Sequence, residues 1–121
     1  MATILVVDDS ATEIHVLKTL LEKNGYQVQT AADGAEGIEA AKTHHPDLIL
    51  MDVVMPVLNG FQATRQLHRD PDTAEIPIIV VTTKDQDTDR SWGLRQGAAD
   101  YIVKPVDPRE LLAKIKTTLG E

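Results

Sequence analysis

Five short apolar runs, separated by segments with helical character, constrain the fold of this 121-residue chain more than any other feature. The runs cover residues 4–7, 26–28, 48–51, 76–81 and 101–103. Four of them are almost continuous in apolar residues, a pattern typical of parallel strands with helices on both faces of the sheet. The run that begins at Tyr26 continues into mixed polar sequence up to Thr30, which favours a strand at the edge of the sheet.

The intervals between these runs predict five helices. We expect them at residues 11–24, 34–43, 60–69, 86–96 and 107–119. The first and the last have an apolar stripe at helical spacing, with Ser10 and Asp107 as N-caps and Pro108 at the first position of the last helix. The fourth has only Trp92 and Leu94 as apolar bulk, so we expect it to be mobile.

The alternation of strand and helix predicts an α/β fold of five βα units. A doubly wound sandwich that begins with a central strand favours a parallel sheet of order 2-1-3-4-5, which is the flavodoxin-like arrangement. Ligands of such sheets bind beyond the carboxyl ends of the strands where the strand order reverses, here between the first and third strands. We expect residues 1–121 to form a single domain, because no linker, low-complexity tract or repeat interrupts them.

Charge and residue types exclude several kinds of function. Nineteen acidic against twelve basic residues give a net charge of −7, so the average field repels nucleic acids and anionic lipid surfaces. The absence of cysteine excludes disulfides and thiolate zinc sites, and the first residues lack the pattern of a signal peptide. We therefore expect a cytoplasmic protein with no membrane insertion and no nucleic-acid partner.

Polar side chains follow four of the predicted strands. Asp8-Asp9, Asp52, Thr82-Thr83 and Lys104-Pro105 come directly after the first, third, fourth and fifth apolar runs. The carboxyl ends of parallel strands meet at one edge, so three carboxylates are expected to lie together and to raise one another's pKa unless a cation joins them. Magnesium, which prefers oxygen ligands and phosphate partners, suits such a site.

These side chains supply the roles that phosphoryl transfer requires. Asp52 can act as the nucleophile, Lys104 and the metal can neutralise charge, and the Thr82 hydroxyl can donate a hydrogen bond to a phosphoryl oxygen. Each residue also has an ordinary interpretation: a capping run at Asp8, a turn after Asp52, a strand end at Thr82 and a solvated Lys104. Those interpretations do not explain why all four positions fall at one edge of the predicted sheet.

Four motifs extend this pattern across the whole chain. They are VVDDS at 6–10, MDVVMPVLNG at 51–60, VVTT at 80–83 and GAADYIVKPV at 97–106. In order and spacing they resemble the receiver domain of two-component response regulators. The resemblance implies that Asp52 is the phospho-acceptor, that Asp8 and Asp9 hold Mg²⁺ together with Asp52, and that Lys104 contacts the phosphoryl group.

The same resemblance assigns a switch and two positions that tune rates. It implies that Thr82 is the switch hydroxyl, that Tyr101 is the switch aromatic, and that the Lys104–Pro105 bond is cis. The tuning positions are Val54, whose backbone carbonyl can still be a metal ligand, and Lys84. Polar residues are frequent at the position of Val54, so we expect slow self-hydrolysis of the phosphorylated form. Asn59, where Asp is commoner, is a conservative change for a turn.

A closer resemblance concerns NGFQATRQL at 59–67 and TTKDQDTDRSWGLRQGA at 82–98. These segments are similar to the single-domain receivers of type IV pilus chemosensory systems, which govern twitching motility. Trp92 would then lie on the fourth helix, in the face that receivers present to partners; the alternative is a half-buried packing residue. His15, His44, His45 and His68 lack the spacing of metal ligands and are expected at the surface.

The combined interpretation is a stand-alone response regulator without an output domain, a monomer or weak dimer that catalyses only its own phosphorylation and dephosphorylation. A chemotaxis-type histidine kinase would phosphorylate Asp52. The new charge would draw Thr82 and Tyr101 inward and change the face formed by the helices at 86–96 and 107–119 and the strand at 101–103, which controls a downstream protein. One alternative is a receiver that acts as a phosphate sink. A second is a Mg²⁺-dependent phosphohydrolase, but Asp52 does not begin the D-x-D motif that such an enzyme needs, and the cap is missing. A third is a flavin-binding module, but Asp8-Asp9 stand where its phosphate-binding loop would be and would repel phosphate.

Overall fold

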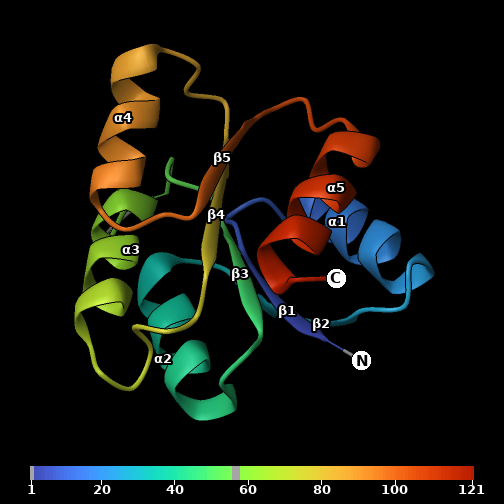
Figure 1. Cartoon of the computed structure of the whole chain (residues 1–121), viewed down its shortest axis with the longest axis horizontal. Helices are drawn as coiled ribbons and strands as arrows, with labels where there is room; N and C mark the ends of the chain where they lie inside the picture. The colour runs from blue at the N-terminus through green and yellow to red at the C-terminus, as the bar shows by residue number, and fades with distance from the viewer. Residues whose placement is uncertain (1, 56–57) are drawn as a thin grey trace.

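The computed structural model describes residues 2–55 and 58–121, and within them the chain forms a five-stranded parallel sheet between two helical layers (Figure 1). The strand order is β2-β1-β3-β4-β5, as the sequence predicts. The strands are β1 (Thr3–Val7), β2 (Gln27–Ala31), β3 (Leu48–Met51), β4 (Ile78–Thr82) and β5 (Asp100–Val103). All four neighbouring pairs are parallel.

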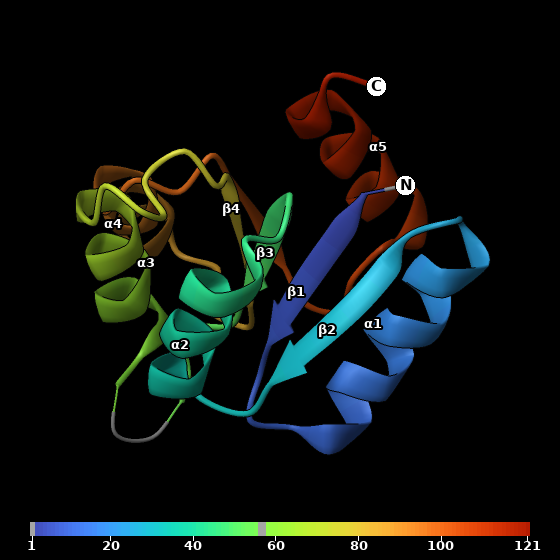
Figure 2. The same cartoon turned by 90° about the horizontal axis from the view of Figure 1, so that it is seen from below.

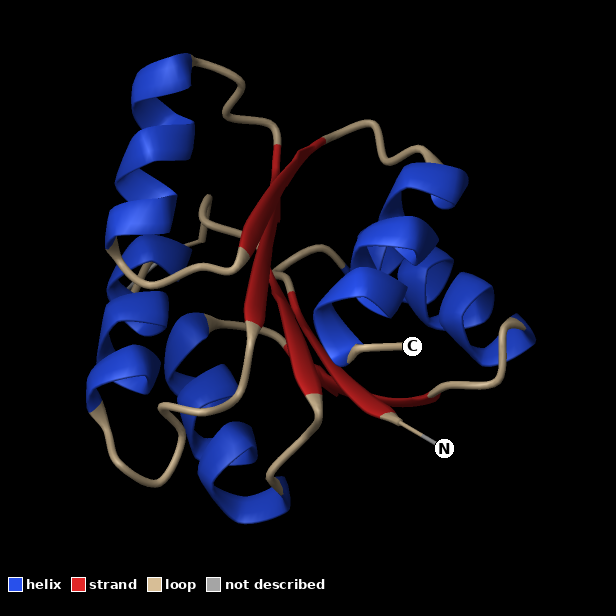
Figure 3. Cartoon of the chain, viewed as in Figure 1, coloured by secondary structure: helices blue, strands red, loops and turns tan. Residues whose placement is uncertain are grey.

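Helices alternate with the strands along the chain, as Figure 3 shows by colour. They are α1 (Ala11–Lys23), α2 (Gly34–His44), α3 (Gly60–Arg69), α4 (Asp87–Arg95) and α5 (Pro108–Leu119). Their ends agree with the sequence-based ranges to within a residue. The larger difference is at β4, which begins at Ile78 and not at Ile76, because Pro77 has no N–H with which to continue a ladder.

Helices α1 and α5 cover one face of the sheet, and α2, α3 and α4 cover the other (Figure 2). Successive strand residues therefore point into different cores. Ile4 and Val6 belong to the cluster that α1 and α5 close, whereas Leu5 and Val7 belong to the cluster beneath α2 and α3. Burial of each such side chain contributes about 1.5–3 kcal/mol. This two-sided burial explains why the central strands are apolar without alternation.

The helix ends confirm the predicted caps. The Ser10 hydroxyl accepts a hydrogen bond from the Glu13 amide at 3.3 Å, and the Asp107 carboxylate accepts one from the Arg109 amide at 2.9 Å. Asn59 also caps α3, in a reciprocal pair with Gln62. These contacts fix where α1, α3 and α5 begin.

Edge and exposed positions also agree with the sequence. β2 is an edge strand, and its exposed and partly buried residues precede the buried Ala31. The four histidines are exposed. Among the described residues, no helix combines the length and the apolar character that a membrane crossing needs.

Candidate functional site

The sheet itself positions the polar residues that follow its strands. The Asp52 amide donates to the Val7 carbonyl at 2.9 Å, and the Lys104 amide donates to the Thr82 carbonyl at 2.7 Å. The parallel hydrogen-bond pattern therefore continues one residue beyond β3 and β5. As a result, Asp52 and Lys104 leave the sheet at fixed places on its carboxyl edge.

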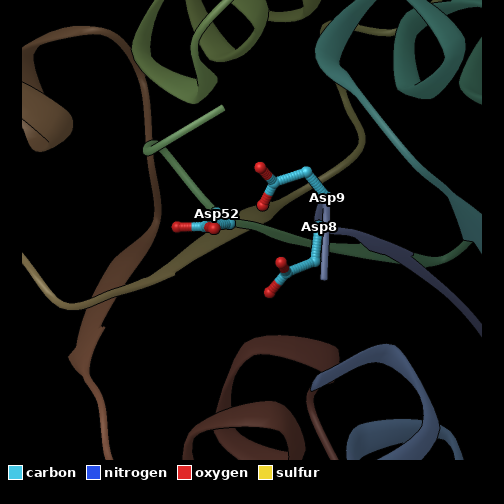
Figure 4. Close-up of side chains that lie close together, drawn as sticks. All are labelled: Asp8, Asp9 and Asp52. Carbon is cyan, nitrogen blue, oxygen red and sulfur yellow. The ribbon is translucent and has the colours of Figure 1, made fainter. Parts of the chain in front are cut away.

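Three carboxylates gather at this edge. One oxygen from each of Asp8, Asp9 and Asp52 lies within 4.8 Å of the others, and Figure 4 shows the three side chains beside the ends of β1 and β3. Asp8 and Asp52 are buried, while Asp9 is exposed. The three residues expected to meet do meet here. Pro56 and Val57, which belong to the motif at 51–60, lie outside the described residues.

Lys104 reaches into this cluster from β5. Its ammonium group lies 2.8 Å from an Asp8 oxygen and 3.8 Å from an Asp52 oxygen. It also lies 3.8 Å from a Glu13 oxygen, on the first turn of α1. Burial lowers the pKa of Lys104, but its hydrogen bond to Asp8 and the attraction of the carboxylates outweigh burial, and the pKa is raised overall. Lys104 is therefore a fixed cation in the site.

Glu13 is the one member of this group that sequence reasoning missed. Its signal is its place three residues after Ser10, in the first turn of the helix that begins at the same edge of the sheet. That signal also fits an ordinary helix start, because acidic residues stabilise helix N-termini.

The pKa of Asp52 is raised, and burial of its carboxyl group is the largest cause. Lys104 opposes the shift, Asp8 adds to it, and hydrogen bonds from the Val54 amide and the Thr82 hydroxyl lower the pKa. The sequence-based expectation gave repulsion between carboxylates as the cause; the structure makes it secondary to burial. A bound divalent cation would reverse the shift, since opposite charge favours the ionised form.

Magnesium fits this set of donors. Opposite ligands of an octahedral Mg²⁺ stand about 4 Å apart, so a group of carboxylate oxygens within 4.8 Å needs only small side-chain movements to share one ion. The cluster holds three carboxylates against one lysine, and a divalent cation would balance that charge.

Thr82 and Tyr101 are connected through the backbone of Lys84. Thr82 is fully buried at the end of β4, and its hydroxyl accepts a long hydrogen bond of 3.5 Å from the Lys84 amide. The Tyr101 hydroxyl donates to the Lys84 carbonyl at 2.9 Å. Burial, followed by repulsion from Asp89, raises the pKa of Tyr101 to about 12.

The Tyr101 ring already lies inside the protein, with 1% of its surface exposed. The ring is thus inward in this structure without a phosphoryl group, and its response to phosphorylation stays a prediction. At Gly93, where α4 passes close to the ring, the helix has no side chain that would occupy this inward place. The Lys104–Pro105 bond is cis, as the family resemblance implies.

A cleft of about 380 Å³ lies at this edge of the sheet, and Asp9, Val54 and Lys84 line it. Val54 is half exposed, and its amide donates to an Asp52 oxygen at 3.2 Å. Met55 and Phe61 form an apolar wall of the same cleft. The wall next to Asp52 thus carries an apolar side chain at Val54, where a polar one could hold a water molecule.

Gly60 packs against the backbone of Asp52. Sequence reasoning missed this contact because it treated Asn59-Gly60 as a turn. A Cβ at Gly60 would collide with the backbone carbonyl oxygen of Asp52. The Gly60 amide also donates to the Val53 carbonyl at 3.2 Å. The start of α3 therefore packs directly against the backbone that carries Asp52, and only glycine allows this approach.

Trp92 is 48% exposed on α4 and lines a hollow of about 240 Å³ together with Phe61, Arg65 and Gln96. The hollow lies between α3 and α4. Trp92 therefore lies on α4 beside α3, as well as beside other exposed residues of α4. Its half-exposed ring is accessible, and its role in a partner face stays a prediction.

Comparisons with known proteins agree with this geometry. The family model described as response regulator receiver domain matches residues 4–116. Protein PilH of Pseudomonas aeruginosa is 57% identical over 120 residues, which cover 99% of each chain.

Solved structures give the same result. The chemotaxis protein CheY4 of Vibrio cholerae superposes with a TM-score of 0.91 at 34% identity, over 98% of each chain. The receiver domain of sensor histidine kinase PA1611 from Pseudomonas aeruginosa, with a magnesium ion in its active-site cleft, has a TM-score of 0.91 at 33% identity, over 99% of this chain and 98% of that one. With the matched sequence, the shared fold and the acidic edge all in agreement, this chain belongs to the response regulator receiver domain family.

Proposed function

We propose that this receiver accepts a phosphoryl group on Asp52 from a histidine kinase and then controls a partner protein. The observation that carries the proposal is a buried Asp52 carboxylate that lies in a cluster with two further carboxylates and 3.8 Å from the ammonium group of Lys104. An anionic nucleophile, a cation site and a fixed lysine are the groups that transfer of a phosphoryl group requires.

Asp8, Asp9 and Asp52, with the Val54 backbone carbonyl, would hold Mg²⁺. Receiver domains bind this ion at an acidic site, and the PA1611 receiver holds one in its cleft. When bound, the metal supplies charge neutralisation for the phosphoryl oxygens. The separate task of this chain's own residues is to present the Asp52 oxygen, to exclude water around it and to keep the Lys104 ammonium group close to it.

In the transfer step, an Asp52 oxygen forms a bond to phosphorus while the bond from phosphorus to the donor's histidine nitrogen breaks. The electron pair of that bond stays with the imidazole, so no proton is taken from Asp52. The Lys104 ammonium and the Thr82 hydroxyl would donate to oxygens of the transferred group. Lys104 must then exchange part of its contact with Asp8 for a contact with the phosphoryl group, which its distance of 3.8 Å from Asp52 allows.

The signal would leave through Thr82, the Lys84 backbone and Tyr101. A phosphoryl group on Asp52 would attract the Thr82 hydroxyl and draw on the loop that holds the Tyr101 hydroxyl 2.9 Å from the Lys84 carbonyl. This stabilises one arrangement of α4, β5 and α5 over another, which is a population shift within one fold. The half-exposed Trp92 extends this surface toward α3.

The similarity to PilH, at 57% identity over nearly the whole length of both proteins, supports a role in pilus-based motility or taxis. We place the protein in the cytoplasm as a single receiver domain, a monomer or weak dimer whose phosphodonor is a chemotaxis-type kinase. It would have no nucleic-acid partner and no catalytic activity beyond its own phosphorylation and dephosphorylation. Val54 and Lys84 would set the rate of the latter.

Incubation with Mg²⁺ and a small acyl phosphate, followed by mass measurement of the intact protein, tests this function. We expect one phosphoryl adduct on the parent and none on Asp52→Asn. Steady consumption of the acyl phosphate with no adduct would favour the phosphohydrolase alternative. An adduct retained in Asp52→Asn would place the acceptor elsewhere.

A further inference from the structure

Helix α4 rests on the rest of the domain in an unusual way. Its one buried residue is Gly93, whereas each of the other four helices buries at least two residues. Gln86 at its N-cap makes no side-chain capping bond. With so little side-chain burial of its own, the position of α4 depends on what lies directly beneath Gly93.

Two aromatic rings occupy that place. A Cβ at Gly93 would stand 3.1 Å from Cε1 of Phe61, and 3.1 Å from both Cδ2 and Cε2 of Tyr101. Carbon atoms attract one another best at about 3.5–4.0 Å, so three contacts at this distance are repulsive. The missing side chain at Gly93 is what lets the rings and the helix backbone lie this close.

The Tyr101 ring has little freedom to move aside while it stays inward. Its hydroxyl donates to the Lys84 carbonyl at 2.9 Å, and the Arg90 guanidinium lies over the ring, 5.4 Å from its centre. Only 1% of its surface is exposed, so packed atoms surround the rest. A methyl group at position 93 would therefore displace either the ring or the helix.

We propose that Gly93 is a positioning residue: its lack of a side chain admits the Tyr101 ring beneath α4 and so couples the place of that ring to the place of the helix. The inference rests on the proposed function in taking Asp52 as the acceptor and Tyr101 as the switch aromatic. Any side chain at position 93 opposes the inward position of the Tyr101 ring. With such a side chain, Asp52 can still be phosphorylated, but α4 no longer moves in response.

The thermal midpoint of Gly93→Ala, measured in three backgrounds, gives the first test. Inside a helix, Gly→Ala ordinarily stabilises a protein. We expect the opposite here: a lower midpoint in the parent and in Tyr101→Phe, which keeps the ring, but a higher midpoint in Tyr101→Ala, which removes it. Ser91→Ala, an exposed change on the same helix, should not change sign between backgrounds.

Two outcomes of this cycle would overturn the proposal. A higher midpoint for Gly93→Ala in the parent would show that the ring yields easily. A lower midpoint in Tyr101→Ala as well would assign the obstruction to Phe61 alone. A glycine that does not contact the ring would not reverse the sign of its effect with the residue at position 101, and the link to phosphorylation is left to the second test.

Trp92, the only tryptophan, gives a second test that needs no folded Tyr101→Ala variant. The parent, Ser91→Ala and Gly93→Ala are treated with Mg²⁺ and acyl phosphate, and adducts are measured by mass alongside Trp92 emission. We expect an adduct in all three, with less than half of the parent's emission change in Gly93→Ala. An equal emission change would contradict the coupling. Absence of an adduct from the parent would instead count against the proposed function, and the thermal cycle would still decide the role of Gly93.

Discussion

At the scale of single residues, the main feature of the site is that the Asp52 carboxylate is buried, although burial disfavours its charge. The carboxyl group is buried beside Asp8, and Lys104 is shared among Asp8, Asp52 and Glu13. Because the pKa of Asp52 is raised, its ionised form is less favourable in the folded protein than in the unfolded chain. The acceptor is therefore kept reactive at some cost to stability.

Asp52→Asn should stabilise the protein when divalent ions are absent. The change keeps the shape of the side chain and removes its buried charge, and we expect a gain of about 1 kcal/mol, or ~4 °C in the melting temperature at neutral pH. The exposed Asp72→Asn is the control. The sign with pH follows from the raised pKa: the gain is present above it and fades as pH falls through it toward the ordinary value of 3.8. A loss of stability at neutral pH would contradict this account.

Asp9 offers a separate test of the metal site, because it is exposed and the fold does not depend on its burial. In the parent, Mg²⁺ at a hundred times its dissociation constant should stabilise the fold by about 2.7 kcal/mol. Asp9→Asn should change the metal-free melting temperature little and reduce the Mg²⁺-dependent increase. Thermal melts across a Mg²⁺ titration measure both. An increase of full size in Asp9→Asn would remove Asp9 from the ligand set.

Val54 should determine how long the phosphoryl group persists. Its side chain is half exposed at the edge of the cleft beside Asp52 and cannot orient a water molecule. We expect Val54→Asn to shorten the lifetime of the adduct by about 10²-fold at most. This factor is the low end of the rate increase that a positioned proton-transfer group provides. The decay of the intact-mass adduct after removal of the acyl phosphate gives the lifetime. Val54→Ala, which adds no polar group, should resemble the parent; an unchanged or longer lifetime in Val54→Asn would refute the assignment.

At the scale of elements, the first residues of α1 and α3 pack against the residues of the site. α3 begins at Gly60, directly against the backbone carbonyl of Asp52, and α1 begins at the edge where Glu13 meets Lys104. Asp52 and Val53 are thereby held between the sheet and the start of α3.

Gly60→Ala should damage both stability and phosphorylation. The added methyl group would force the Asp52 carbonyl and α3 apart, at a cost of roughly 1–3 kcal/mol. The adduct should form more slowly, because the acceptor oxygen no longer faces Lys104 correctly. Gln66→Ala, an exposed change on the same helix, should do neither. Denaturant melts and adduct formation with time are the measurements; a rate equal to that of the parent would show that the loop position does not depend on this contact.

Features that leave a local sequence pattern could be predicted, whereas features that depend on packing between elements could not. Strands such as Leu48–Met51 and the caps Ser10 and Asp107 could be predicted, because burial on two faces and capping each leave a local pattern. The meeting of Asp8, Asp9 and Asp52 followed from topology alone. Glu13, Gly60 and Gly93 could not be predicted, because each acts through a packing contact between different elements that the neighbouring sequence does not record. The inward Tyr101 is likewise a matter of packing that no local pattern records.

At the scale of the whole molecule, the parallel sheet directs every strand end to one edge, and two helical layers hold that edge rigid. The helices differ in how many side chains they bury. α1 and α5 bury leucine and isoleucine side chains on one face and α3 buries Leu67 on the other, whereas α4 buries a glycine alone. A change at Asp52 is therefore expected to spread toward α4 and not toward α1.

The central claim is that Asp52, and neither neighbouring aspartate, carries the phosphoryl group. Borohydride reduces an acyl phosphate of aspartate to homoserine, so treatment of the protein with Mg²⁺ and acyl phosphate, then borohydride, then peptide mass mapping, locates the group. We predict homoserine at position 52, with Asp8 and Asp9 unchanged. Homoserine at position 8 or 9, or an unmodified Asp52 in protein whose melting temperature rises with Mg²⁺, would contradict the account.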